Sequence, residues 1–190
     1  MGSLVLAMFT SLDGRTEGAD GQFRPPPWSD EVEKHWSLAG LGRARHLLYG
    51  RRNFLFNREF WQAAETDPGS IAASIAYAGT MNRLPKTVVS TTLEGNPGWN
   101  ARLMRGDVAG AVARLKAEVD GDIFSFGGAG LAHSLVAHDL PDEYRIMVTP
   151  TIFGNGKRLF ADGLPPLELE TVDVRRLDTG SAIIHYRRVR

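Results

Sequence analysis

The stretch GDIFSFGGAGLAHSLVAHD, residues 121–139, indicates how the whole chain folds. It starts with a short buried strand at residues 123–126 and then passes through the glycine turn 127–130. A helix follows, in which Leu131 and Leu135 recur at the spacing of one helical turn. A strand that turns directly into a helix exposes backbone N–H groups at the positive end of the helix dipole, where a phosphate can bind. The same residues also suit a tight connection that binds no ligand.

The glycine turn does not follow the dinucleotide-binding pattern of the Rossmann fold. That pattern is G-x-G-x-x-G, and with Gly128 and Gly130 as its first glycines, His133 stands where the third is required. The turn therefore indicates a phosphate site in a fold of another kind. His133 and His138 lie five residues apart on the expected helix, a spacing that does not favour a metal site, and we expect no bound metal.

Short apolar runs alternate with segments of helical period along the rest of the chain. Further strands are predicted at residues 4–9, 46–49, 87–89, 101–104 and 144–149, and a hairpin is predicted at residues 168–174 and 182–189. Helices are predicted with Ser29 as an N-cap, over residues 69–80, and over residues 108–119. Residues 14–28 are predicted to be irregular, and the aromatic segment 54–61 follows no pattern that assigns it to a helix or a strand.

This order predicts an α/β fold in a single domain of residues 1–190: a mostly parallel sheet with a C-terminal antiparallel hairpin and helices on both faces. Ligands of such sheets bind beyond the carboxyl ends of the parallel strands. We expect Arg51 or Arg52 to hold a phosphate there through its guanidinium group, and Ser90 and Thr91 to hydrogen-bond it. The two arginines also suit a solvated turn.

Composition restricts the possible classes of function. The 22 basic and 22 acidic side chains balance, so no overall positive field favours nucleic acid or an anionic membrane. The chain has no cysteine, which excludes disulfides, thiol nucleophiles and cysteine-bound metals. No apolar run reaches the roughly 20 residues of a membrane span, and the N-terminal run has only six apolar residues with no basic region before it. We expect a cytoplasmic protein that acts on a small molecule.

Five motifs occur in an order that resembles a known family. They are SLDGRT (residues 11–16), LLYGRRNF (47–54), KTVVSTTL (86–93), FGGAGLAHSL (126–135) and LPDEYRIMVTPTIFGNGKRLF (140–160). Over nearly its whole length the chain resembles the dihydrofolate-reductase-like superfamily. Within it, the chain is most similar to the C-terminal reductase domain of bifunctional riboflavin-biosynthesis proteins and its stand-alone relatives. The resemblance implies a mixed sheet of eight strands that binds NADPH along its carboxyl edge, and a homodimer, since relatives often dimerise.

The resemblance also implies which residues bind the cofactor. Arg51 and Ser90 would face the 2′-phosphate of the adenosine, a dianion that favours NADPH over NADH, and Asn53 would lie near the phosphates. Ala7 would hydrogen-bond the nicotinamide carboxamide through its backbone. The pyrophosphate would lie against Gly127, Gly128, Ala129, Gly130 and Leu131.

The chain departs from the family pattern in two ways. The zinc deaminase half of the bifunctional enzymes is absent, because its ligands include cysteines. Dihydrofolate reductases place a carboxylate five residues after the Trp of a Pro-Trp pair; Trp28 follows Pro27 here, and counting five gives Glu33, but the intervening proline is missing. Glu33 also suits the solvated face of a helix start. Asp13, in the SLDG turn, is the stronger candidate for orienting the substrate or relaying a proton, although turns often contain aspartate.

The sequence therefore predicts an NADPH-dependent reductase that transfers hydride to a small heterocycle of the pterin or ribosylaminopyrimidine type, or to a related C=N or C=O group. Two alternatives remain open at this point. One is an NADPH-binding module that has lost turnover, and the other is a true dihydrofolate reductase.

Overall fold

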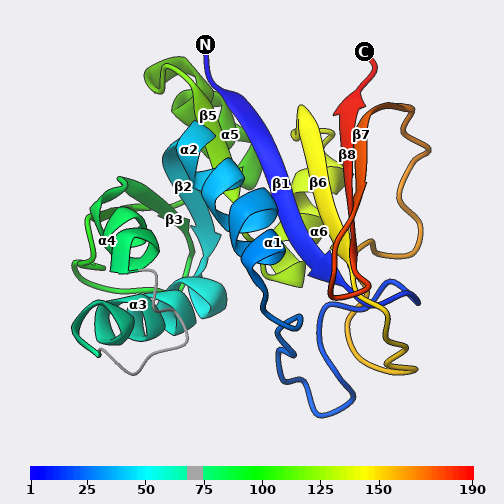
Figure 1. The fold of residues 1–190 in the computed structure, drawn as a ribbon. Helices are drawn as coiled ribbons and strands as arrows, with labels where there is room; N and C mark the ends of the chain where they lie inside the picture. The colour runs from blue at the N-terminus through cyan, green and yellow to red at the C-terminus, as the bar shows by residue number, and fades with distance from the viewer. Residues whose placement is uncertain (68–74) are drawn as a thin grey trace.

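The computed structural model describes residues 1–67 and 75–190 and contains an eight-stranded sheet in the order β4-β3-β2-β5-β1-β6-β8-β7 (Figure 1). The first six strands in that order are parallel, and β8 and β7 form an antiparallel hairpin at one side. The strands are β1 Ser3–Thr10, β2 Ala44–Gly50, β3 Lys86–Val89, β4 Ala101–Met104, β5 Asp122–Ser125, β6 Glu143–Val148, β7 Leu169–Arg176 and β8 Ala182–Arg188. The predicted sheet and its strands are confirmed.

Helices cover both faces of the sheet, as predicted. They are α1 Asp30–Val32, η1 Glu33–Leu38, α2 Ala39–Arg43, α3 Arg51–Thr66, α4 Ile75–Arg83, α5 Val108–Glu118 and α6 Ala129–Ala137. The front face of the sheet, nearest the viewer in Figure 1, is the one covered by α1, η1, α2, α3 and α4, and the back face is covered by α5 and α6. In the described part of the chain, no helix combines the length and the apolar character needed to cross a membrane.

Side chains alternate between the two faces, so each face has its own core. On β1, Val5 and Ala7 pack on the front with Trp36 of η1 and Phe54 of α3. Leu4, Leu6 and Met8 pack on the back with apolar residues of α5 and α6. A central strand that is buried on both sides has to be apolar throughout, and this explains the continuous run that predicted β1.

Helix α3 is the main element that the sequence did not predict. The aromatic segment 54–61, which was left unassigned, lies inside this 16-residue helix, and Arg51–Asn53 form its first turn rather than a loop. Aromatic residues have only middling helix propensity, and Gly50 caps the helix without any side-chain hydrogen bond, so neither the usual start signal nor strong propensity marks it. Residues 69–74 of the helix predicted over 69–80 lie outside the described residues, and α4 continues to Arg83.

The helix predicted from Ser29 is present but irregular. The Ser29 hydroxyl accepts a hydrogen bond from the Val32 N–H at 3.2 Å, which confirms the N-cap, and the helix then widens into the π-helical turn η1. A π-turn changes the pairing of backbone carbonyls, and the Arg145 guanidinium, from β6, donates to the carbonyls of His35 and Trp36. Burial lowers the pKa of Arg145 to about 10, which still leaves it charged at neutral pH.

Candidate functional site

Strand β5 is shorter than both of its neighbours at the edge where the parallel strands end, here called the carboxyl edge. β5 ends at Ser125, opposite Leu6, whereas β1 continues to Thr10 and β2 to Gly50. Beyond Leu6, the side of β1 that faces β5 therefore has no strand partner. The backbone from Ala7 onward is thus free of ladder pairing on that side, where the sequence predicted a carboxamide contact.

The helices that follow β2 and β5 leave the sheet on opposite faces. α3 packs on the front face and α6 on the back, so their N-terminal ends meet where the two adjacent strands stop. The meeting is close: the Asn53 side chain of α3 donates to the carbonyls of Phe126 at 3.1 Å and Gly127 at 2.8 Å. An ideal Cβ on Gly50 would lie 3.3 Å from the Leu131 side chain. Two positive helix ends at such a divergence point form the usual nucleotide position of an open α/β sheet.

The glycine turn before α6 leaves its backbone open to a ligand. Gly127 has φ +91°, and a Cβ there would lie 2.3 Å from Met8 Sδ, so only glycine fits without displacement. By contrast, a Cβ on Gly130 would meet nothing within 4 Å, and one on Gly128 would meet only the Asn53 Cβ at 3.9 Å. As the first helical residues, Ala129 and Gly130 present N–H groups that no carbonyl within the helix can accept.

Arginines gather at the carboxyl edge beside β2, β3 and β4. Arg51 donates to the Thr92 hydroxyl at 2.7 Å, and Arg105 donates to the carbonyl of Thr91 at 3.2 Å. The Ser90 hydroxyl accepts from the N–H groups of Thr92 and Leu93, which holds the loop that presents Thr91. None of the ion pairs found within residues 1–67 and 75–190 involves Arg51, Arg52 or Arg105. The carboxyl edge therefore has a positive end with no acidic partner in the described chain.

Asp13 lies at the same edge but is fully engaged by the protein. Its carboxylate accepts from the Ser11 hydroxyl at 2.6 Å and from the N–H groups of Phe153 at 3.0 Å and Gly154 at 2.9 Å. The hydrogen bond from Ser11, followed by that from Phe153, lowers the pKa of Asp13 from its ordinary 3.8 to about 2. At neutral pH the group is an anion that fastens the loop after β1 to the loop after β6.

Glu33 lies on η1, on the front face, and its carboxylate is free of hydrogen bonds and ion pairs within the described chain. Four residues later, Ser37 is hydrogen-bonded to the Tyr77 side chain of α4, whose ring is 4.8 Å from that of Trp61 in α3. Residues four apart share a helix face, so the half-buried Glu33 lies on the same side of η1 as Ser37. The structure thus brings Asn53 and the glycine turn together. The two acids differ in their surroundings: the Asp13 carboxylate accepts hydrogen bonds, whereas the Glu33 carboxylate accepts none within the described chain.

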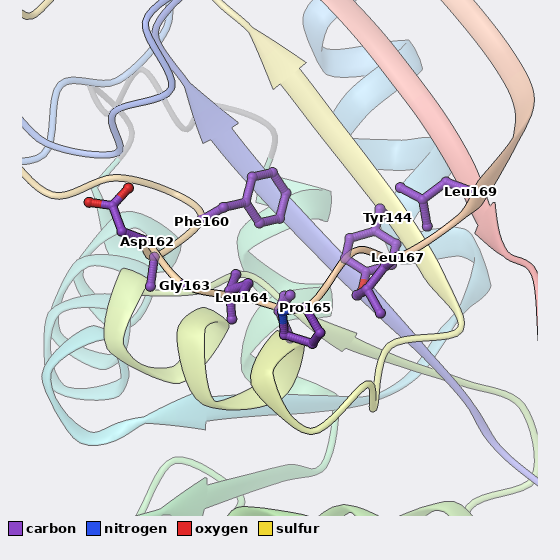
Figure 2. Close-up of a pocket in the computed structure, with 10 residues that line it drawn as sticks. Tyr144, Phe160, Asp162, Gly163, Leu164, Pro165, Leu167 and Leu169 are labelled. Carbon is purple, nitrogen blue, oxygen red and sulfur yellow. The ribbon is translucent and has the colours of Figure 1, made fainter.

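A separate hollow of about 390 Å³ lies on the back face, between α6, β6 and the segment that leads into β7 (Figure 2). Tyr144, Phe160, Leu164 and Leu167 line it together with other mainly apolar groups, and Asp162 is its one charged lining residue in the described structure. It has none of the arginines that gather at the carboxyl edge. Its lining does not suit a phosphorylated ligand.

The chain matches a family of known proteins. Residues 3–183 match the family described as the RibD C-terminal domain. The chain belongs to this family. The protein YyaP of Bacillus subtilis (strain 168), whose function is uncharacterized, is 24% identical over 184 residues, which cover 96% of this chain and 93% of YyaP.

Three solved structures show the fold that this family member shares. A protein of Shewanella sp. PV-4 named for riboflavin biosynthesis has a TM-score of 0.77 at 22% identity, with both chains fully covered. The diaminohydroxyphosphoribosylaminopyrimidine deaminase/5-amino-6-(5-phosphoribosylamino)uracil reductase of Thermotoga maritima has a TM-score of 0.68 at 17% identity over 99% of this chain and 57% of its own. Dihydrofolate reductase from Enterococcus faecalis has a TM-score of 0.61 at 14% identity, covering 98% and 96%. The fold is dihydrofolate-reductase-like.

Several residues near the site were not predicted from the sequence. Thr92 is the hydrogen-bond partner of Arg51, and Asn57 donates to the backbone and side-chain oxygens of Asn53. Asn53 and Asn57 stand four residues apart, a spacing that becomes meaningful only once α3 is recognised as a helix. Because helix α3 was not predicted, the contact between Asn53 and Asn57 was not predicted either.

We predict that Gly127→Ala destabilises the protein. The added Cβ would collide with Met8 Sδ, and the backbone at position 127 has a positive φ, which alanine disfavours. The free energy of unfolding should therefore fall by about 1–3 kcal/mol. Urea unfolding followed by circular dichroism measures it. The matched control is Gly130→Ala, in open space within α6, which should leave stability unchanged or raise it by up to about 1 kcal/mol. Equal effects of the two substitutions would contradict the packing argument.

We also predict that Asp13→Asn lowers the melting temperature at pH 7 and that this difference disappears in acid. The carboxamide NH₂ would face a backbone N–H that now donates to a carboxylate oxygen. Because folding depresses the pKa of Asp13, the stabilisation is present above pH 3.8 and is lost as pH falls toward about 2. Thermal unfolding between pH 7 and 2 measures both proteins. Asp20→Asn, which removes an exposed pair with Arg24, should change little, and a pH-independent difference for Asp13→Asn would count against the latch.

Proposed function

We propose that this protein is an NADPH-dependent reductase that transfers hydride to a small heterocycle, or to a related C=N or C=O group. The observation that carries the proposal is the position of the glycine turn. It lies beyond the short strand β5, between the N-terminal ends of α3 and α6. On one side of it are arginines that form no ion pair within the described chain. Membership of the RibD C-terminal domain family supports the reductase class.

The residues of the carboxyl edge fit an extended phosphorylated cofactor. Gly127, Gly128, Ala129, Gly130 and Leu131 would bind the pyrophosphate through the open backbone at the start of α6. Arg51, with Ser90 and Thr91, would bind the 2′-phosphate, and Asn53 would keep the turn in place while lying near the phosphates. The backbone of Ala7, the first residue of β1 without a paired residue on β5, would bind the carboxamide. The fit is supported by the dihydrofolate reductase of the same fold, which was solved as a complex with NADP(H).

When bound, NADPH would supply a hydride from C4 of its nicotinamide ring. The chain's own contribution would be to bring donor and acceptor carbons to about 3–3.5 Å and to supply a proton where the product needs one. Of the two candidate acids, Glu33 is the better suited to do this, because its carboxylate makes no hydrogen bond or ion pair within the described chain. Asp13 accepts hydrogen bonds with both oxygens, so we assign it the positioning of the two loops at the edge.

True dihydrofolate reductase is a second candidate, favoured by the position of Glu33 on the front-face helix. Competitive inhibition by methotrexate would support it. A third possibility, an NADPH-binding module without turnover, would be supported by NADPH binding with no oxidation over pterins, ribosylaminopyrimidines, quinones and nitro compounds. Failure of NADPH to raise the melting temperature at any concentration would exclude all three.

We predict that Arg51→Gln weakens NADPH binding but not NADH binding. A hydrogen bond to a charged group contributes about 1.5–3 kcal/mol, so the dissociation constant for NADPH should rise about 10- to 150-fold. Isothermal titration calorimetry with both cofactors measures this. Arg45→Gln is the matched control, since Arg45 stands near the start of β2, the strand whose other end leads into Arg51. Parallel losses for NADPH and NADH would contradict the assignment of Arg51 to the 2′-phosphate.

We predict that Glu33→Gln lowers turnover by about 10²-fold while leaving NADPH affinity unchanged, because it removes a proton source but no cofactor contact. The measurement is steady-state oxidation of NADPH at several pH values with the best substrate of the panel. Asp30→Asn is the control, as a neighbouring acid on the exposed start of the same helix. Unchanged turnover in Glu33→Gln would show that another group supplies the proton and would count against a dihydrofolate reductase.

A further inference from the structure

An aromatic row, formed by Phe9, Phe23, Phe56 and Phe60, crosses the front side of the carboxyl edge. Phe23 belongs to loop 14–28, and its ring centroid lies 6.0 Å from that of Phe9 on β1 and 6.3 Å from that of Phe56 on α3. Phe56 in turn is stacked with Phe60 at 6.3 Å and an interplanar angle of 10°. A single ring from the loop thus connects two aromatic surfaces that belong to different elements.

The row adjoins the proposed nicotinamide position. Phe9 stands two residues beyond Ala7, on the same face of β1. Phe56 and Phe60 lie three and seven residues after Asn53, on the helix face that Asn53 turns toward Gly127. Phe23, Phe56 and Phe60 are 45%, 53% and 45% exposed, far more than rings that serve only as core. Large apolar groups left exposed together in this way commonly mark a binding surface.

Phe23 is held there mainly by its ring contacts. The described hydrogen bonds of residues 18–28 stay within the loop: Gly18 pairs with Gln22, and the Asp20 carboxylate accepts from the Gln22 N–H and from Arg24. Gly18 and Pro26 are the buried residues of this part of the loop, and Phe23 is not among them. A ring without polar anchoring can be replaced by another ring that makes the same stacked and edge contacts.

We infer that Phe23 occupies the position of the substrate's ring, and that the substrate of the proposed reductase is a planar conjugated ring that displaces Phe23 from between Phe9 and Phe56. This inference rests on the proposed function. Phe9 and Phe56 would hold the ring by its faces and edges, next to the backbone of Ala7. Saturated or puckered molecules would not recover the stacking that Phe23 gives up, so loop 14–28 acts as a selector for flat substrates.

The test is calorimetric binding of two planar probes, lumazine and menadione, to the NADPH-free protein, with cyclohexane-1,4-dione as the saturated comparison. Menadione is usable because the chain has no thiol for it to alkylate. Phe23→Ala removes the competing ring and should tighten binding of at least one planar probe by about fivefold or more, as expected when a closed state no longer competes. Phe56→Ala should weaken the same probe, and Phe23→Tyr, which keeps a ring at this position, should bind it about as the natural protein does.

Phe160→Ala is the matched control, because Phe160 is 43% exposed in the separate hollow of Figure 2. Weaker binding in Phe23→Ala, unchanged binding in Phe56→Ala, equal tightening in Phe160→Ala, or no binding of either planar probe to any variant would overturn the inference. NADPH protection against thermal unfolding is measured on the same variants. Loss of NADPH binding with retained probe binding would contradict the proposed function alone, and the reverse result would contradict the ring inference alone.

Discussion

The contact between Gly127 and Met8 is the constraint on which the candidate site depends. No side chain fits at position 127, because a Cβ would lie 2.3 Å from the Met8 sulfur. Glycine therefore lets the chain leave β5 early and turn directly into α6. That early ending leaves β1 without a strand partner on the β5 side beyond Leu6 and brings the starts of α3 and α6 together. Asn53 then fixes the turn from the neighbouring helix.

The strands were predictable because their signals are local. A strand buried on both faces, such as β1, needs a continuous apolar run, and the β7–β8 hairpin shows the alternation of exposed strands. The Ser29 N-cap is equally local, and it is confirmed. Helix α3 was not predictable in the same way, because its buried residues are few and its aromatic rings face partly outward. Its existence follows from packing against β2 and β3, which no local pattern records.

The candidate site was predictable in its place but only partly in its chemistry. The strand ends and the glycine turn pointed to the edge of the sheet where the structure brings Asn53 and the glycine turn together. The difference between the two acids, however, depends on contacts between distant parts of the chain. The Asp13 carboxylate accepts hydrogen bonds from N–H groups 140 and 141 residues away, which keep it ionised and make it a poor proton source. Glu33 meets no such partner in the described chain. Counting from a motif locates a carboxylate but says nothing about what already binds it.

Loop 14–28 is attached near both of its ends by hydrogen bonds. In both cases the partner residue lies outside the strands of the sheet. At one end the Thr16 N–H donates to the Lys157 carbonyl at 2.9 Å, and at the other the Ser29 hydroxyl donates to Asp178 at 2.6 Å. The stretch between these two attachments, residues 17–28, contributes no strand to the sheet. A change in its length or sequence would leave every strand pairing of the sheet intact, so the ring that Phe23 places between Phe9 and Phe56 can be altered without altering the sheet.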